Sequence, residues 1–345
     1  MEQLLISLIQ LAIDKKASDI HFIQEKNHLQ IQLRTMRGII PLYQDLWDTG
    51  FFEFLKFHAG FDLTNPYLPQ SGQFEIKIQQ RRIYCRFSVI VNQTIQTGVL
   101  RMLNTREDLS IEDLTDNPVH RKYMHRICQL RHGLVISTGP TNSGKTTTLH
   151  AILHTIAAQG QYKVVSLEDP IEIEDASYLQ LQINEMQGFT YEKGIEELLR
   201  HDPDVIFIGE TRNAYTAHMV VRAALTGHLV FTTMHSKNGQ ESLQRLYDFG
   251  IRPIELRNTL TAILSQRLYL KDRKGGKQCI YEILSDKALV YTIEKGKTPP
   301  KFHTLSYEIQ NALDNGDIID PQAFRDLQGL QTGDEAISSN DESWL

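Results

Sequence analysis

Residues 139–146 read Gly139-Pro140-Thr141-Asn142-Ser143-Gly144-Lys145-Thr146. This octet matches G-x-x-x-x-G-K-[ST], a loop whose backbone N–H groups form an anion-binding nest at the start of a helix. The apolar run 134–138 before it predicts a buried strand, and residues 147–153 after it predict the first turns of a helix. Because strand, glycine loop and helix stand in this order, the sequence predicts a site for a nucleoside triphosphate.

Each position of the loop has a physical use. Gly139 and Gly144 let the backbone approach the phosphates closely and adopt positive φ. Lys145 supplies positive charge at the β- and γ-phosphates, and the Thr146 hydroxyl is a hard oxygen ligand for Mg²⁺. We therefore expect ATP and Mg²⁺ as cofactors. The nucleotide-binding candidates in this segment are Gly139, Pro140, Thr141, Asn142, Ser143, Gly144, Lys145, Thr146 and Thr147.

Composition bounds the class of protein. The chain has 345 residues, more than one ordinary hydrophobic core accommodates, so two domains are expected. Lys and Arg total 36 against 42 Asp and Glu, and the net charge of −6 argues against a general nucleic-acid coat. The three cysteines, Cys85, Cys128 and Cys279, lack metal-ligand spacing and indicate free thiols in a reducing compartment.

The first residues do not resemble a secretory signal. Residues 1–12 are apolar, but Glu2 lies at their start and the leucines that follow keep a helical stripe. No run reaches the roughly 18 apolar residues needed to cross a bilayer. We expect a cytoplasmic protein that associates peripherally with the cytoplasmic face of the membrane through a partner.

Hydrophobic periodicity predicts an N-terminal α+β domain over residues 1–103. A helical stripe covers 2–16. Alternating segments predict strands near 28–34, 73–79, 82–90 and 96–103. The polar stretch 104–120 is expected to form a linker.

The remaining chain predicts a P-loop α/β domain over residues 121–330. Short apolar runs typical of buried parallel strands lie at 134–138, 163–167, 205–209 and 229–233. Residues 331–345 are polar and acidic and are expected to be a disordered tail.

Two acidic clusters follow predicted strands of this second domain. Glu168 and Asp169 stand at a strand end closed by Pro170, where they are candidates for orienting an attacking water; a solvated acidic turn is the alternative. Glu210 ends the apolar run 205–209 in the manner of a Walker B strand, where it would serve Mg²⁺ or help to activate the nucleophile. A capped buried strand is the alternative for this second cluster.

Histidines and arginines complete the list of candidates. His228 and His235 bracket an apolar strand and could sense the γ-phosphate or link it to a neighbouring subunit, although a single histidine is commonly structural. Arg86 and Arg101 lie on two predicted strands of the first domain. An arginine delivered from outside the P-loop stabilises charge on a transferring phosphoryl group, whereas composition alone indicates surface residues.

Taken together, these segments resemble the ATPases of type II secretion and type IV pili. The resemblance covers about residues 14–285 and rests on motifs in both domains. These are the P-loop 139–146, the aspartate box 167–172, the Walker B segment 199–210, the histidine box 226–235, Ala17-Ser18-Asp19-Ile20-His21, Leu68-Pro69-Gln70-Ser71-Gly72-Gln73-Phe74, the pair Arg86 and Arg101, and Ser265-Gln266-Arg267-Leu268.

The resemblance implies a RecA-like ATPase domain, a smaller PAS-like N-terminal domain and a homo-hexameric ring. ATP would sit between the two domains of a subunit, and Arg86 and Arg101 from an N-terminal domain would complete the site. Glu168 would polarise the attacking water and Glu210 would serve the magnesium. His228 and His235 become catalytic candidates, and Arg200 and Arg212, from the Walker B segment and the run that follows it, join the nucleotide-binding candidates.

Three departures from the family pattern indicate which branch of the family the chain resembles. Two acidic positions after the Walker B segment are Asn213 and Tyr215 here, so any role of those carboxylates is absent or moved. A four-cysteine zinc module common after Gln-Arg-Leu is replaced by residues 271–279, whose one cysteine, Cys279, cannot make such a site, so we expect no zinc. The N-terminal docking domain of many assembly ATPases is also expected to be missing.

These departures favour the competence ATPases of Gram-positive bacteria. Such a protein would drive assembly of a pilus for DNA uptake by working on a polytopic inner membrane platform protein, without binding nucleic acid itself. The alternatives are a pilus retraction ATPase, a nucleotide-binding regulator with little turnover, and a DNA-translocating motor, which lacks a basic stripe here.

Overall fold

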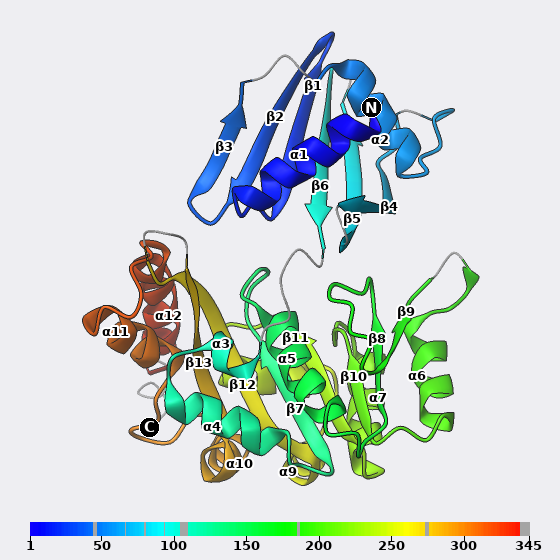
Figure 1. Ribbon diagram of the computed structural model, residues 1–345. Helices are drawn as coiled ribbons and strands as arrows, with labels where there is room; N and C mark the ends of the chain where they lie inside the picture. Colours follow the sequence, from blue (N-terminus) through cyan, green and yellow to red (C-terminus); the bar gives the residue numbers. More distant parts are fainter. Residues whose placement is uncertain are drawn as a thin grey trace. The chain divides into compact units, whose positions relative to one another are not determined.

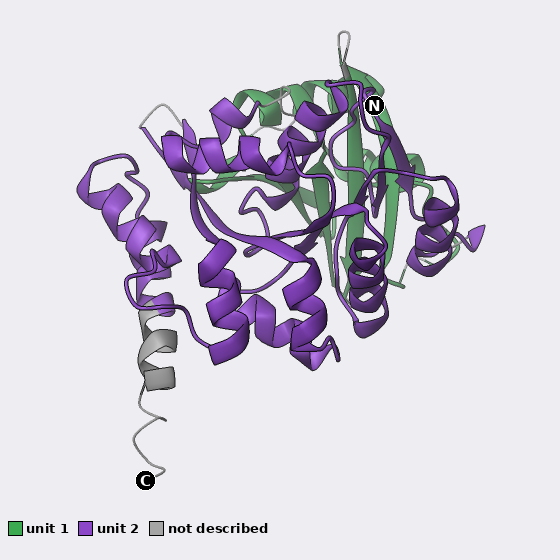
Figure 2. Cartoon of the chain, turned by 90° about the horizontal axis from the view of Figure 1, so that it is seen from below, with its two compact units in different colours: residues 1–107 green, residues 108–345 purple. Residues whose placement is uncertain are grey.

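The computed structural model describes residues 1–43, 47–65, 67–78, 81–92, 94–103, 110–184, 187–272 and 276–338, of which 81 and 331–338 are described by their backbone alone. The chain divides into two compact units, residues 1–107 and 108–345, which Figure 2 colours separately. Within the described ranges, no helix is both long and apolar enough to cross a membrane.

Unit 1 is a six-stranded antiparallel sheet with two helices packed against it (Figure 1). The strand order is β3-β2-β1-β6-β5-β4. Its elements are α1 (Glu2–Asp14), β1 (Asp19–Glu25), β2 (His28–Thr35), β3 (Gly38–Leu42), α2 (Thr49–His58), β4 (Gln70–Ile78), β5 (Arg81–Val91) and β6 (Ile95–Met102).

One face of this sheet is apolar because alternate residues of each strand point to the same side. Phe22, Phe52 and Phe87 pack there, and the Phe22 and Phe52 rings each lie 5.7 Å from the Phe87 ring. The other face carries polar side chains, including both predicted arginines. The predicted helix and four strands are present, whereas β1, β3 and α2 were not anticipated. The PAS-like class expected for this unit remains a prediction.

Unit 2 is built on a seven-stranded sheet in the order β13-β12-β7-β11-β10-β8-β9. All neighbouring strands are parallel except the last pair, β12 and β13. Its elements are α3 (Ile111–Leu114), α4 (Pro118–Ile127), β7 (Gly133–Thr138), α5 (Lys145–Ala157), β8 (Val164–Glu168), β9 (Leu179–Gln182), α6 (Tyr191–Arg200), β10 (Val205–Ile208), α7 (Ala214–Leu225), β11 (Leu229–Met234), α8 (Gly239–Asp248), α9 (Pro253–Thr259), β12 (Leu260–Leu270), β13 (Lys277–Ser285), α10 (Asp286–Lys295), α11 (Leu305–Asp314) and α12 (Gln322–Ser338).

Helices cover both faces of this sheet, so its central strands are fully buried, as their continuous apolar runs require. Helices α3, α4 and α5 pack on one face, and α6, α7, α8, α9 and α10 on the other. The C-terminal helices α11 and α12 form a further core with Tyr269 and Ile280 at the β12–β13 edge. This arrangement confirms the predicted P-loop α/β fold.

Two predicted boundaries differ from the structure. Residues 110–120, assigned to a linker, hold α3 and the start of α4, and Ile111 and Leu114 are buried against α5. Residues 104–109 lie outside the described residues. The tail predicted to be disordered from Gln331 instead continues α12 to Ser338, after Leu327 and Leu330 anchor that helix; residues 339–345 lie outside the described part.

Candidate active site

The phosphate-binding loop connects β7 to α5 at the carboxyl edge of the parallel sheet. Its path requires three residues at positive φ: Gly139 (151°), Asn142 (65°) and Gly144 (90°). A Cβ atom on Gly139 would lie 2.6 Å from the carbonyl oxygen of Gln266, so only glycine fits there. The structure therefore contains the glycine loop that residues 139–146 predict, with glycine at the positions where the backbone requires it.

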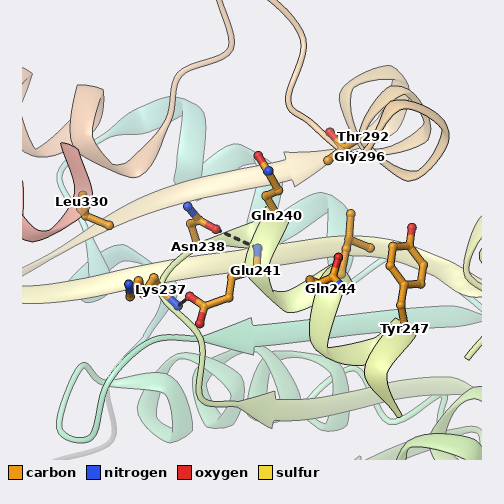
Figure 3. Close-up of a pocket in the computed structure, with 10 residues that line it drawn as sticks. Lys237, Asn238, Gln240, Glu241, Gln244, Tyr247, Thr292, Gly296 and Leu330 are labelled. Atoms are coloured by element: carbon orange, nitrogen blue, oxygen red, sulfur yellow. Dashed lines mark hydrogen bonds between the residues drawn. The ribbon is translucent and has the colours of Figure 1, made fainter. Parts of the chain in front are cut away.

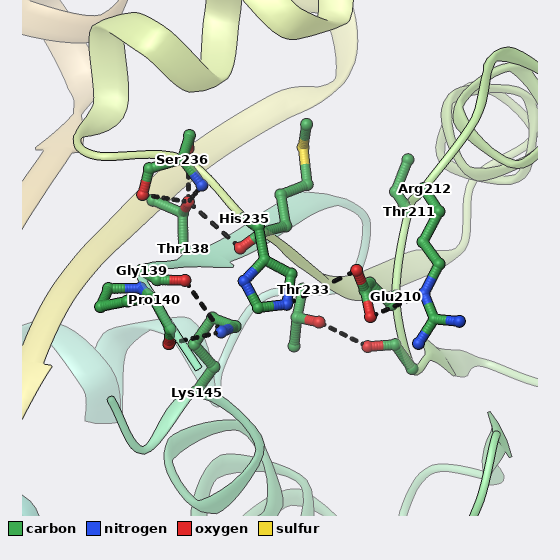
Figure 4. A network of polar contacts seen from close by, with 12 residues as sticks. Thr138, Gly139, Pro140, Lys145, Glu210, Thr211, Arg212, Thr233, His235 and Ser236 are labelled. Atoms are coloured by element: carbon green, nitrogen blue, oxygen red, sulfur yellow. Dashed lines mark hydrogen bonds and ion pairs between the residues drawn. The ribbon is translucent and has the colours of Figure 1, made fainter. Parts of the chain in front are cut away.

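Lys145 lies across this loop. Its ammonium donates hydrogen bonds of 2.9 Å to the carbonyl oxygens of Gly139 and Pro140, as Figure 4 shows. The residue is only 7% exposed, and burial lowers the pKa of the ammonium to about 8, although the carboxylates of Glu210 and Glu172 oppose that shift. A buried lysine held beside a glycine loop is poised to exchange carbonyl partners for phosphate oxygens.

Gln266 holds the P-loop through side-chain hydrogen bonds, a role that the sequence did not indicate. The side chain is fully buried; its Nε2 donates to the carbonyl oxygen of Ser143 at 2.9 Å, and its Oε1 accepts from Ser137 Oγ at 2.9 Å. The family element that contains Gln266 thus fixes the backbone of the P-loop from the neighbouring strand β12.

Glu210 stands beside the loop at the end of β10. Its carboxylate pairs with Arg212 Nε at 2.9 Å and lies 3.6 Å from His235 Nε2 (Figure 4). Burial and the charge of Lys145 lower the pKa of His235, so its ring is neutral at pH 7. The structure therefore brings together four predicted residues: Lys145, Glu210, Arg212 and His235.

The loop that carries His235 is tied to the P-loop strand. The Ser236 N–H donates to Thr138 Oγ1 at 3.1 Å, and the Arg245 guanidinium contacts the His235 carbonyl oxygen. Because Thr138 immediately precedes the P-loop, these hydrogen bonds connect the two loops directly.

The donor set around the loop fits a magnesium ion bound with a nucleotide. Thr146 offers a half-buried hydroxyl, and Glu210 offers a carboxylate whose charge reaches Lys145. Magnesium in nucleotide sites uses one or two protein oxygens together with phosphates and water, so a large cage of protein ligands is not needed. Among the described residues no group of three His, Cys, Asp or Glu side chains could hold a metal.

Glu168 is placed differently from the expectation of a water-polarising group. It is 2% exposed; Oε1 accepts from Ser166 Oγ at 2.7 Å and Gln180 Nε2 at 3.1 Å, and Oε2 lies 3.2 Å from His150 Nε2. Tyr178 adds a hydrogen bond of 2.5 Å to the other ring nitrogen of His150. His150 lies in the helix that begins at Lys145, so this network ties the aspartate box to the P-loop helix.

His228 and Arg200 are not part of the cluster within one chain. His228 precedes β11, at the end opposite His235, and a strand of this length puts it roughly 20 Å from the P-loop edge. There the Nδ1 atom lies 3.0 Å from the Ala223 carbonyl oxygen. Arg200 ends α6 at the same amino-terminal edge and pairs with Glu197. Of the two roles considered for His228, only a link to a neighbouring subunit remains a prediction.

Arg86 and Arg101 are direct cross-strand partners on β5 and β6. Their side chains leave the sheet on the polar face, where Arg101 Nε pairs with Asp19 Oδ1 at 2.7 Å and Arg86 Nε donates to Ser71 Oγ at 3.3 Å. The structure thus groups the two arginines within unit 1. Their contribution to the nucleotide site of unit 2 remains a prediction.

The departure at Asn213 has a structural explanation. Asn213 caps α7, and its Oδ1 accepts from the Thr216 N–H at 2.9 Å. Asparagine and aspartate are equally good helix caps, so the exchange preserves the fold of this segment. Tyr215 is 40% exposed, and nothing in the structure explains its replacement of an acid.

The segment 271–279 is described only in part, because residues 273–275 lie outside the described residues. Cys279 is buried at the P-loop side of β13, with Sγ 3.8 Å from the Ser143 carbonyl oxygen. The absence of zinc remains a prediction.

A separate pocket of about 460 Å³ lies beside α8 (Figure 3). Its wall consists of Lys237, Asn238, Gln240, Glu241, Leu243, Gln244, Tyr247, Thr292, Gly296 and Leu330. The wall includes neither the P-loop nor Glu210 or His235, so this pocket is distinct from the nucleotide site.

Comparison with known proteins places this site in context. The family model for "Type II/IV secretion system protein" matches residues 1–302. Competence protein ComGA of Bacillus subtilis (strain 168) is 32% identical over 315 residues, which cover 86% of this chain and 88% of that protein. Type II secretion system protein E of Klebsiella pneumoniae is 35% identical over 270 residues, 77% of this chain but 54% of that longer protein.

Solved structures agree in fold. The pilus retraction motor PilT with bound ADP superposes with a TM-score of 0.71 and 25% identity, covering 92% of this chain and 95% of that one. The Legionella pneumophila ATPase DotB gives a TM-score of 0.75 at 20% identity, with 94% and 95% covered.

Proposed function

The chain belongs to the type II/IV secretion system protein family, and from this premise we propose that it is the hexameric motor ATPase that assembles a competence pseudopilus for DNA uptake. ATP hydrolysis itself follows from the family and its ATPase members, and a motor of pilus or competence machinery follows from the relatives. The match to ComGA along most of both chains supports the competence assignment.

The observation that carries the enzymatic part is the cluster around the P-loop. Lys145 lies across the glycine loop, Glu210 and His235 stand beside it, and the loop of His235 is hydrogen-bonded to Thr138. We assign Lys145 to the β- and γ-phosphates and His235 to contact with the γ-phosphate. When bound, Mg²⁺ would neutralise charge on the same oxygens, held by Thr146 and Glu210.

The buried Glu168 and the partly exposed Glu210 take different roles in this proposal. Glu168 has both oxygens occupied by Ser166, Gln180 and His150, so it would have to leave these partners before it could polarise water. Glu210 is 19% exposed at the side chain and already faces Lys145 and His235. We therefore place Glu210 next to the attacking water and give Glu168 a positioning role between β8 and α5.

Arginines from an N-terminal domain complete the site in the proposed ring. Arg86 and Arg101 are cross-strand partners on the polar face, Arg101 bonded toward β1 and Arg86 toward β4, and two guanidinium groups on one face suit the spread charge of a transferring phosphoryl group. A closed ring provides such a contact between subunits. The ring would act at the cytoplasmic face of the membrane on a polytopic platform protein and would not bind DNA directly, in keeping with the net charge of −6.

One alternative is a motor ATPase that retracts a pilus instead of assembling it. The likeness to PilT at 25% identity over nearly the whole chain favours retraction as a second candidate. The low-turnover regulator loses support, because the Asn213 exchange preserves a helix cap and Lys145, Thr146 and Glu210 are all retained.

The experiment that tests the proposal is phosphate release measured over a range of protein concentrations, with Lys145→Ala as control. Specific activity should rise with concentration and vanish in the control, because sites that complete themselves between subunits need assembly. ATP binding without turnover at every concentration would contradict an autonomous motor. Glu210→Gln should bind ATP and release phosphate at less than about one-hundredth of the normal rate.

A further inference from the structure

Unit 1 carries a continuous row of charged side chains across its polar face. In the sheet register Asp19 of β1 pairs with Arg34 of β2 on one side and Arg101 of β6 on the other, and Arg101 pairs with Arg86 of β5. Strands β2, β1, β6 and β5 follow one another in this order in Figure 1. Directly opposed residues of antiparallel strands project to the same face, so the carboxylate stands between Arg34 and Arg101, with Arg86 on the far side of Arg101.

Asp19 is the buried member of this row. It is 1% exposed, whereas the Arg101 side chain is 42% exposed. One carboxylate oxygen, Oδ1, accepts from Arg101 Nε at 2.7 Å, and the other, Oδ2, accepts from Ser18 Oγ at 2.8 Å. A buried carboxylate with both oxygens bonded is itself fixed in place and so anchors the side chain that it holds.

The contact uses only one edge of the guanidinium. Arginine carries five N–H donors, and a bond at Nε leaves the two terminal nitrogens to form the outer edge of the fork. That edge matches two oxygens of a phosphate. Burial and the charges of Arg34 and Arg101 lower the pKa of His21, two residues along β1, so positive charge is concentrated on this face.

We propose that Asp19 is a positioning residue that holds the Arg101 guanidinium by its Nε edge, so that the outer edge is presented to the phosphates of ATP. The proposal rests on the proposed function, because it gives Arg101 a part in the ATPase site. Asp19 itself touches no phosphate. It acts by fixing the rotamer of Arg101 before the reaction. Without Asp19, this long side chain would have to be ordered in the transition state, at a cost in side-chain entropy.

This role predicts a separation between turnover and nucleotide affinity. Without the carboxylate, Arg101 keeps its full charge but loses its fixed direction. Phosphate attraction is then undiminished, so the KM for ATP should stay constant or fall, while kcat should drop by about tenfold to a hundredfold. A purely structural role would lower the midpoint of thermal unfolding and the amount of folded protein, with no change in kcat per folded site.

The experiment compares kcat and KM of the full-length chain for Asp19→Ala and Asp19→Asn. Asp19→Asn keeps size and one hydrogen-bond acceptor, so it should fold and show a smaller kcat loss than Asp19→Ala. The matched control is Glu75→Gln, which removes the carboxylate of an exposed pair with Arg82 in the same sheet, 3.7 Å apart, and should leave kcat unchanged. Wild-type kcat in both Asp19 variants would overturn the proposal.

A double-mutant cycle separates this inference from the proposed function. Arg101→Gln keeps a donor for Asp19 and lacks the guanidinium; it should lower kcat by about a thousandfold. In that background Asp19→Asn should cause no further loss, because Asp19 acts through Arg101. An equal loss in both backgrounds would overturn the inference alone, whereas wild-type turnover of Arg101→Gln would overturn the role of Arg101 and, with it, that of Asp19.

Discussion

ATP affinity should weaken steeply above pH 8, because the ammonium that meets the phosphates is buried. Lys145 has its pKa lowered to about 8 by burial, against an ordinary value of 10.5. Protonated lysine binds phosphate and the neutral amine does not, so the apparent Kd follows the protonated fraction. At pH 9 about one-tenth of the free protein is protonated, and the Kd should be about ten times its value at pH 7.

The assay is equilibrium binding of a fluorescent ATP analogue with Mg²⁺ at constant ionic strength, from pH 7 to pH 9.5. Titration of His235 does not contribute to the change in Kd over this pH range, because its pKa is lowered and its ring is already neutral at pH 7. Lys145→Arg is the matched control, since a guanidinium stays charged throughout; its affinity should be weaker but flat with pH.

The outcome that would refute this reasoning is a wild-type Kd that stays constant up to pH 9.5. The lysine would then keep its ordinary pKa, and the arrangement in which it is buried against the Gly139 and Pro140 carbonyls would not describe the nucleotide-free protein.

Three further predictions concern other parts of unit 2. Gln266→Leu leaves the Ser143 carbonyl and the Ser137 hydroxyl without their partner, so the free energy of unfolding in urea should fall by about 2–4 kcal/mol. ATP affinity should fall as well, and an unchanged affinity for ATP would argue against a role of Gln266 in holding the P-loop. Asn213→Ala should lose about 1 kcal/mol, or roughly 2–4 °C of melting temperature, whereas Asn213→Asp should lose nothing, and equal melting temperatures for all three proteins would show that the cap is unimportant. His228→Ala should leave ATP affinity of the dilute protein unchanged, because the ring lies at the opposite end of β11; a weakened Kd at low protein concentration would place it in the site.

The P-loop could be predicted because its chemistry is local. Eight consecutive residues specify positive φ, a lysine and a hydroxyl, and the flanking apolar strand and helix are also read from short windows. The same holds for Glu210, since the end of a buried parallel strand places its next residues at the carboxyl edge of the sheet.

The contacts of Glu168 could not be predicted in this way. His150 reaches Glu168 from α5, and Tyr178, in the segment before β9, contacts His150 on its other ring nitrogen, so the network depends on how a helix packs on the sheet. The same rule separates the two histidines, because His228 precedes β11 and so lies at its amino end, whereas His235 follows β11 at the carboxyl edge that holds the P-loop.

The stretch 110–120, predicted to be a linker, carries local signals of the helices found there. Asn117-Pro118 is a helix start with a capping residue followed by proline at the first helical position, and the structure shows α4 beginning there. Ile111 and Leu114, three apart, were the apolar side of the short α3.

The central claim is that one subunit's P-loop is completed by an arginine from a neighbouring subunit. The most direct test mixes two inactive variants in equal amounts: Lys145→Ala, which retains Arg101, and Arg101→Gln, which retains the P-loop. If subunits mix randomly in a ring, half of the P-loops are intact and half of their neighbours supply the arginine, so phosphate release should recover to about a quarter of the wild-type rate. No recovery, with mixed rings shown to form, would contradict a site shared between subunits.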